Sequence, residues 1–246
     1  MMREVLLILG AFFAGSIPFG LFIGRAKGID IRQHGSGNIG ATNVGRVLGR
    51  KFFFLCFALD FLKGFAPTLG AGIVLGAIGG GAREWADQRV ALVWLAVMVA
   101  AVLGHVFSPW LKFKGGKGVA TALGAMMGVF PHFTIAGAGA FIVWLLALAV
   151  WRTISVSSIL AGLALPVIVV VDWLLMDGPL FNDMPREQGR VVRFEDGWPY
   201  MAVAVLLAGL VVWTHRANIK RLRAGTEPRV GEKKGVVPGS QPPMKG

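Results

Sequence analysis

Long apolar segments, each of about the length that crosses a membrane, dominate this sequence. The first of them, residues 5–24, contains no charged residue. A helix rises about 1.5 Å per residue, so about 20 apolar residues span a hydrocarbon core about 30 Å thick. Only 15% of the 246 residues are charged, whereas about a quarter is usual in soluble domains. The chain is therefore predicted to be an all-α, polytopic membrane helix bundle without a soluble domain.

Four further segments have the length and hydropathy of single spans, and they are residues 52–78, 90–111, 154–175 and 198–214. The first of these four carries Asp60 and Lys63, which share one helical face because they lie three residues apart. Opposite charges so placed offset part of each other's desolvation. We expect this pair to face protein rather than lipid.

The segment 119–151 is too long for one comfortable span and short for two. Pro131 and His132 lie in its middle, and a proline there interrupts a helix. The pattern predicts a tight helical hairpin, which brings the total to about seven spans. A re-entrant segment is the alternative, and it gives the same sidedness.

The distribution of basic residues predicts the orientation. Lys and Arg accumulate on the cytoplasmic side of membrane proteins. With seven spans and an external N-terminus, that side carries 18 of the 25 Lys and Arg residues but only three of the 13 acids. A single span over 119–151 would instead place the basic C-terminal tail outside. We therefore predict a cytoplasmic C-terminus, one membrane domain over residues 1–231, and a disordered tail over 232–246.

Composition also excludes several classes of function. The lone Cys56 lies in an apolar segment and cannot form an intrachain disulfide, which argues against a disulfide-rich secreted scaffold. The formal charge of +12 is spread between membrane-length segments, a pattern that indicates topology and anionic ligands rather than nucleic acid. The scattered His, Cys and acidic residues show no metal-ligand spacing.

The first cytoplasmic loop, residues 25–51, is rich in glycine and in neutral polar side chains. Its residues 35–40 fit G-x-G-x-x-G, but they follow a membrane span rather than a strand, so a dinucleotide site is not expected. Glycines that bring backbone amides together, with an arginine nearby, favour a phosphate-binding nest. The polar side chains in question are Ser36, Asn38, Thr42, Asn43 and Arg46. An ordinary turn with a topological arginine is the alternative.

The second loop contains Gly-Gly-Lys-Gly at residues 115–118, directly before an apolar helix. It is not a Walker motif, because Leu111 and Gly118 occupy two of its defining positions. A lysine beside free amides at a helix start nevertheless predicts an anion site. Lys117 could equally serve only as a determinant of topology. His105, on the membrane side of the loop, is expected to be buried and hydrogen-bonded in a structural role.

The third loop and the tail add further candidates. Arg152, Ser155 and Ser158 are spaced by three and share one face of a helical turn, where an arginine and hydroxyls can line a phosphate site. In the basic tail, His215 and Asn218 are the residues that topology does not explain. The four segments together predict an anionic ligand, most simply a phosphate ester.

These motifs, in this order, resemble those of the bacterial acyl-phosphate:glycerol-3-phosphate acyltransferases. The resemblance covers about residues 5–231, and its segments are 36–43, 59–65, 104–107, 113–121, 218–222 and the pattern Arg152-x-x-Ser155-x-x-Ser158. It implies a seven-helix enzyme of the bacterial inner membrane, with its active site facing the cytoplasm. Such enzymes transfer a fatty acyl group from acyl phosphate to the 1-hydroxyl of glycerol 3-phosphate. The products are lysophosphatidic acid and phosphate, in the committing step of phospholipid synthesis.

The chemistry of the loops, together with this resemblance, gives a hypothesis for the roles of particular residues. Lys117, Ser36 and Asn38 are expected to act in catalysis. The expected substrate-binding residues are Arg46, Thr42, Asn43, Ser155, Ser158, Arg152, His215 and Asn218. Of these, His215 and Asn218 rank second, Arg152 and Ser158 could equally be structural, and a helix cap is the alternative role for Ser155. No metal or cofactor is expected, and the expected partners are the two substrates, membrane lipid and an upstream acyl-phosphate-forming enzyme. Neither His-x4-Asp nor G-x-S-x-G occurs, so direct transfer without an acyl-enzyme is the mechanistic hypothesis.

Two other classes of function remain open at this point. A transporter for an anionic organophosphate would use an acid inside a span, and Asp60 is the clearest candidate. It should, however, show polar specificity on both faces rather than one. A lipid-binding structural protein would tolerate neutral replacement of Ser36 or Asn43.

Overall fold

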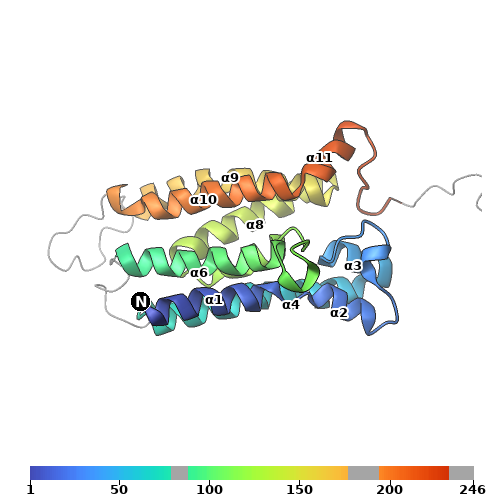
Figure 1. Cartoon of the computed structure of the whole chain (residues 1–246). Helices are drawn as coiled ribbons and strands as arrows, with labels where there is room; N and C mark the ends of the chain where they lie inside the picture. Colours follow the sequence, from blue (N-terminus) through green and yellow to red (C-terminus); the bar gives the residue numbers. More distant parts are fainter. Residues whose placement is uncertain (79–87, 177–193, 233–246) are drawn as a thin grey trace, which may run out of the picture.

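The computed structural model describes residues 1–78, 88–176 and 194–232, and every regular element in these ranges is helical. Figure 1 shows long helices running roughly side by side, with short helices gathered at one end. The α-helices are α1 (Met2–Ser16), α2 (Phe19–Arg25), α3 (Ala41–Leu48), α4 (Arg50–Val74), α6 (Gln88–Val106), α7 (Val119–Met127), α8 (His132–Trp151), α9 (Ile154–Met176), α10 (Phe194–Thr214) and α11 (Arg216–Arg223). Two 3-10 turns are η1 (Ile31–Gln33) and η2 (Pro109–Leu111). The predicted all-α class is confirmed for the described residues, and most of the predicted tail lies outside them.

Five helical segments of the described chain are long and apolar enough to cross a membrane. They are Met2–Arg25, Arg50–Val74, Gln88–Leu111, Phe133–Trp151 and Ile154–Asp172. The pair Trp198–Thr214 and Arg216–Arg223, bent by 56°, is a sixth candidate. We take the span to end at Thr214, because α11 beyond the bend is strongly basic. The predicted spans are thus found as helices, but the total of seven depends on the segment 119–151.

That segment is broken where the sequence predicts. α7 ends at Met127 and α8 begins at His132. The nine residues of α7 extend only about 14 Å, too short to cross a hydrocarbon core of about 30 Å. The break is therefore confirmed, whereas the described residues show no seventh full-length span, and external placement of the N-terminus stays a prediction.

Glycines let α7 lie directly against α4. A Cβ at Gly64 of α4 would overlap the carbonyl oxygen of Thr121, and one at Gly124 of α7 would overlap that of Phe61. Small residues at such contacts allow close backbone approach between helices in a membrane. Because α7 is held against protein, its ends can find polar partners other than lipid.

The first span contains an interruption that its hydropathy does not reveal. α1 ends at Ser16 and α2 begins at Phe19, so the carbonyls of Ser16 and Ile17 leave the helical pattern. The Ser108 hydroxyl donates to the Ser16 carbonyl at 2.7 Å, and the Lys63 ammonium donates to the Ile17 carbonyl at 2.7 Å. Unsatisfied backbone groups are costly away from water, so these two side chains make the interruption tolerable.

Lys63 also forms the predicted ion pair. Its Nζ lies 2.7 Å from Asp60 Oδ1, and each side chain is 3% exposed. His105 Nδ1 lies 3.8 Å from the same carboxylate oxygen and within hydrogen-bonding distance, 3.1 Å, of the Thr121 hydroxyl. The pair thus faces protein, and His105 is buried and bonded as expected. We call Asp60, Lys63 and His105 the buried charge cluster, which connects the α1–α2 break with α4, α6 and α7.

Removing one member of the ion pair should destabilise the protein strongly. Replacing Lys63 by methionine leaves a buried carboxylate without its counterion and removes the donor to Ile17, a loss of about 3–5 kcal/mol by analogy with other buried pairs. We expect the melting temperature of the purified protein in detergent to fall by about 10 °C.

Lys51→Met, on an exposed position of the same helix, is the matched control and should change the melting temperature little. The double variant Asp60→Leu/Lys63→Met should lose less than the single variant, since no lone charge stays buried. Equal melting temperatures for Lys63→Met and Lys51→Met would contradict this account.

Candidate functional site

The segments predicted to share the cytoplasmic side lie together at one end of the bundle (Figure 1). They are the loop between α2 and α3, the loop between α6 and α7, the α8–α9 turn and α11 with the residues after it. Their charges act on one another, because Lys117 of the second loop lies in the fields of Glu227, Arg221 and Arg46. The structure thus assembles the predicted polar segments into one site.

Asn43 organises the first loop. Its Oδ1 accepts from the Ser36 amide at 2.8 Å, and its Nδ2 donates to the carbonyls of Ile31, His34 and Asn38 at 2.9–3.2 Å. The side chain is buried and its amide group is fully engaged with the loop backbone. Asn43 therefore shapes the loop in this structure and presents no free group to a ligand.

The other polar residues of this loop are more accessible. Asn38 Oδ1 accepts from the Gly40 amide at 2.8 Å, just before α3 begins. Ser36 and Arg46 are exposed, and Thr42 is partly buried. The loop therefore holds Ser36, Thr42 and Arg46 where a ligand could reach them, on a frame that Asn43 and Asn38 fix.

The second loop rests on His105. The amides of Gly115 and Gly116 donate to the carbonyls of Val106 and His105 at 3.0 and 3.1 Å, so these two amides are not free as the sequence suggests. A Cβ at Gly116 would overlap His105 Nε2, and Gly118 has φ +77°, a conformation that suits glycine. The first turn of α7, directly after Gly118, has no side-chain cap, so its amides can still donate to a ligand.

Lys117 carries the main positive charge of this loop into the site. Burial lowers the pKa of its ammonium to about 8, the negative charge of Glu227 opposes that shift, and the positive charges of Arg221 and Arg46 add to it. Near neutral pH Lys117 is protonated, but its charge is held less firmly than that of an exposed lysine. A phosphate bound beside Lys117 would stabilise the charged ammonium and raise its pKa again.

Glu227 lies at the centre of the third part of the site. Its Oε1 accepts from the Ser155 hydroxyl and from Asn218 Nδ2, both at 2.6 Å, and its Oε2 accepts from Arg221 Nε at 2.7 Å. Burial would raise the pKa of this carboxyl, but the three donors outweigh it and lower the pKa. Ser155 and Asn218, both predicted to bind substrate, are thus bonded to a carboxylate of the chain.

The sequence analysis gave Glu227 and Arg221 no role. The available signal was a single acid, Glu227, at the end of a basic helix. Its meaning depends on Ser155, which lies 72 residues away along the chain.

His215 lies directly after the last span and is buried beside Lys117. Its Nδ1 lies 2.8 Å from the Val211 carbonyl, so Nδ1 carries the proton and Nε2 is an acceptor. Burial, reinforced by the charge of Lys117, lowers the pKa of His215 to about 4. The imidazole is therefore neutral at pH 7.

Two predicted substrate-binding residues stand apart from this site. The Ser158 hydroxyl donates to the Ile154 carbonyl at 2.9 Å and accepts from Trp144 Nε1 at 3.2 Å, which ties α9 to α8. Arg152 ends α8 with φ 52°, and its carbonyl accepts from the Val230 amide at 2.6 Å. In this structure, Ser158 and the Arg152 backbone hold helices and tail together.

The site contains the chemistry of an anion-binding centre. Lys117, Arg46 and Arg221 supply cations, and Glu227 is the carboxylate among them. Within residues 1–78, 88–176 and 194–232 no group of three or more His, Cys, Asp or Glu side chains could hold a metal ion. Cations, hydroxyls and helix-start amides suit phosphate groups and developing oxyanions.

Comparison with known proteins agrees with this chemistry. The family model described as glycerol-3-phosphate acyltransferase matches residues 5–225. A glycerol-3-phosphate acyltransferase of Geotalea daltonii is 39% identical over 228 residues, which cover 92% of this chain and 97% of that protein. One of Geobacter sulfurreducens is 41% identical, with 93% and 98% covered.

Solved structures show the same likeness. A crystal structure of PlsY (YgiH), an integral membrane glycerol 3-phosphate acyltransferase in its glycerol 3-phosphate form, matches with a TM-score of 0.72. The two chains are 36% identical, and the match covers 93% of this chain and 96% of the other. The lysophosphatidic acid form of the same protein matches with a TM-score of 0.70.

Anion binding at Lys117 should weaken as the pH rises. A lysine whose pKa is about 8 loses its charge as the pH passes through that value, whereas an ordinary lysine stays charged to above pH 10. We expect the affinity for inorganic phosphate, measured by calorimetry, to fall by up to about tenfold between about pH 7.5 and about pH 9.5.

Lys117→Arg is the control, because a guanidinium keeps its charge throughout this range and should give a flatter profile. A wild-type profile as flat as that of Lys117→Arg would contradict the role assigned to this ammonium.

Proposed function

This chain belongs to the glycerol-3-phosphate acyltransferase family, and we propose that it uses acyl phosphate as the donor for the 1-hydroxyl of glycerol 3-phosphate. The products are then lysophosphatidic acid and inorganic phosphate. The enzyme is an acyltransferase of the membrane, and the reaction supplies lipid synthesis with its first acylated glycerol. The proposal concerns the donor, the products and the residues that bind them.

The observation that supports it is the convergence of Lys117, Arg46 and Arg221 at one end of the bundle. Both proposed substrates carry a phosphate, so the site must hold two such groups near each other. Cations from three separate segments around one carboxylate provide more than one position for a phosphate. An acyl-CoA thioester would not need a second phosphate position at the reacting carbonyl.

In this proposal, some residues contact the substrates, and others hold those contact residues in position. Lys117 and Arg46 bind phosphate, while Ser36 and Thr42 contact substrate from the first loop. Asn43 and Asn38 hold that loop in shape through its backbone. Asn38, predicted to be catalytic, thus acts in this proposal by positioning.

The α8–α9 turn and the tail contribute polar groups that Glu227 holds in position. Its carboxylate orders Ser155, Asn218 and Arg221, whose remaining hydrogen-bonding groups line the phosphate position. Arg152 and Ser158 do not contact substrate in this proposal, and they hold the α8–α9 turn and the tail in place.

The proposed transfer is direct. The glycerol oxygen forms a bond to the acyl carbon, the bond from that carbon to the phosphate oxygen breaks, and inorganic phosphate leaves. The hydroxyl proton passes to a substrate phosphate oxygen. His215 is a weak base, because its pKa is about 4, but its Nε2 can accept a hydrogen bond and orient glycerol.

The membrane supplies the acyl donor in this proposal. The acyl chain lies between helices, where many apolar side chains of α8 and α9 are exposed on the bundle surface. The polar site faces the cytoplasm of a bacterial inner membrane, as the distribution of Lys and Arg favours. An upstream enzyme that forms acyl phosphate would deliver the donor.

The transporter alternative loses its main support. Asp60, the acid inside a span, is bound by Lys63 and belongs to the buried charge cluster. Asp60 therefore has a structural role and is not a carboxylate that a substrate could reach from both sides of the membrane.

The proposal predicts donor specificity and dependence on Lys117. Purified enzyme with glycerol 3-phosphate should form lysophosphatidic acid from palmitoyl phosphate and none from palmitoyl-CoA. Lys117→Ala should lower kcat/KM by at least about 100-fold, the typical cost of removing one oxyanion-stabilising donor.

Lys51→Ala, on an exposed position at the start of α4, is the matched control and should retain wild-type turnover. Product from palmitoyl-CoA alone, or normal turnover in folded Lys117→Ala, would refute the proposed donor or the proposed role of Lys117 respectively.

A further inference from the structure

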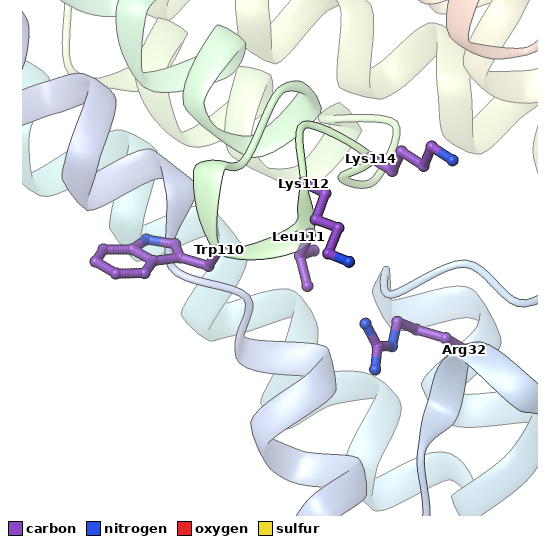
Figure 2. Close-up of a pocket in the computed structure, with 5 residues that line it drawn as sticks. All are labelled: Arg32, Trp110, Leu111, Lys112 and Lys114. Carbon is purple, nitrogen blue, oxygen red and sulfur yellow. The ribbon is translucent and has the colours of Figure 1, made fainter.

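A second group of cations lies outside the proposed catalytic site. Arg32, Lys112 and Lys114, with Trp110 and Leu111, line a cavity of about 290 Å³ that opens to the surface. Figure 2 shows Lys112 and Arg32 extending toward each other from opposite loops, while the Trp110 ring projects to the other side of its loop. Lys114 extends away from these two in the same view, so the cavity is lined by three cations, of which Lys112 and Arg32 converge, with an aromatic residue at its edge.

Two of the three positive charges of this cavity are not balanced by the chain, because only Arg32 has an acidic partner. Asp30 is the acid closest to it in sequence, and both oxygens of its carboxylate already accept from Arg32, with Nε at 2.9 Å and Nη2 at 2.5 Å. In the described part of the chain, neither Lys112 nor Lys114 forms an ion pair or a side-chain hydrogen bond. Two exposed lysines therefore give the cavity a surplus of positive charge.

The cavity also lies where the membrane surface is expected. The third candidate span ends at Leu111, so Lys112 and Lys114 follow it immediately. Trp110 is 64% exposed, yet its Nε1 donates to the Ser16 hydroxyl at 2.8 Å, which fixes the position of the ring beside the first span. Exposed tryptophan next to lysines at the end of a span is typical of the level of lipid headgroups.

The backbone holds this arrangement in place. Lys112 and Phe113 are consecutive residues in the left-handed region, with φ 51° and 60°. The Phe113 amide donates to the Ser108 carbonyl at 2.9 Å, and the Lys114 amide donates to the Leu111 carbonyl at 3.0 Å. The turn places both lysines on one cavity and leaves Phe113, 63% exposed, between them. Topology alone requires basic residues here, but it does not require Lys112 to extend toward Arg32 of another loop.

We propose that this cavity binds the phosphate of an anionic phospholipid from the adjacent leaflet, with Lys112, Lys114 and Arg32 around the headgroup and Trp110 in contact with the lipid. Basic pockets at the cytoplasmic ends of membrane helices bind such headgroups. The site is separate from that of Lys117, which acts with Glu227, Arg221 and Arg46. The proposal does not depend on the reaction that the enzyme catalyses.

Native mass spectrometry of the protein in detergent tests the proposal directly. Dioleoyl phosphatidylglycerol is the probe, and dioleoyl phosphatidylcholine is the neutral comparison. We expect a phosphatidylglycerol adduct that phosphatidylcholine does not replace. Lys112→Gln/Lys114→Gln should weaken its apparent affinity about tenfold, because each lysine near an anionic lipid surface contributes appreciably to binding.

The control removes the same charge elsewhere. Lys51→Gln/Lys220→Gln changes two exposed lysines at the same end of the bundle, outside the cavity, and should leave the adduct unchanged. Lys112→Arg/Lys114→Arg keeps the charge and should keep the adduct, which separates lost binding from misfolding. Equal losses in the two glutamine variants would overturn the proposal.

A last comparison distinguishes lipid from soluble phosphate. Saturating glycerol 3-phosphate should leave the phosphatidylglycerol adduct in place if the cavity is a lipid site. Displacement of the adduct by glycerol 3-phosphate, or an equally strong phosphatidylcholine adduct, would overturn the proposal in favour of a soluble phosphate ester or of unspecific lipid association.

Discussion

The ion pair between Lys63 and Asp60 connects the polar groups that would be most costly to bury in a membrane, namely two charged side chains and the free carbonyl at the break after α1. Two charges removed from water are costly unless each is bonded, and Lys63 bonds both Asp60 and the Ile17 carbonyl that the break after α1 exposes. His105 lies beside the same carboxylate and carries the glycine loop on its other side. The position of Lys117 therefore depends on a buried interaction within the bundle.

The sequence predicted those features of the fold whose cause is local. A run of apolar residues is long enough to span, opposite charges three residues apart share a face, and a proline ends a helix, so the spans, the ion pair and the break near Pro131 follow. Pro18 is a comparable local signal for the break after Ser16, but the sequence does not show that Ser108, 92 residues away, bonds the freed carbonyl. The shortness of α7 likewise depends on glycine contacts with α4.

The candidate site shows the same division. Residue types and spacing indicated phosphate chemistry and selected Lys117, Arg46 and Ser155, but they could not show how each side chain is bonded. Asn43, grouped with the substrate contacts, bonds the loop backbone, and Ser158 ties two helices, which is the structural role left open for it. Glu227 was overlooked because an acid in a basic tail has no meaning until folding brings its partners to it.

Glu227 should also affect the rate at which a bound phosphate leaves the site. A phosphate that approaches Lys117 enters a field that this carboxylate already partly neutralises. A purely cationic centre would hold a product phosphate tightly and delay its departure. In the proposed reaction, this carboxylate among the cations would weaken the binding of both the incoming and the outgoing phosphate, which favours exchange of substrate and product over retention.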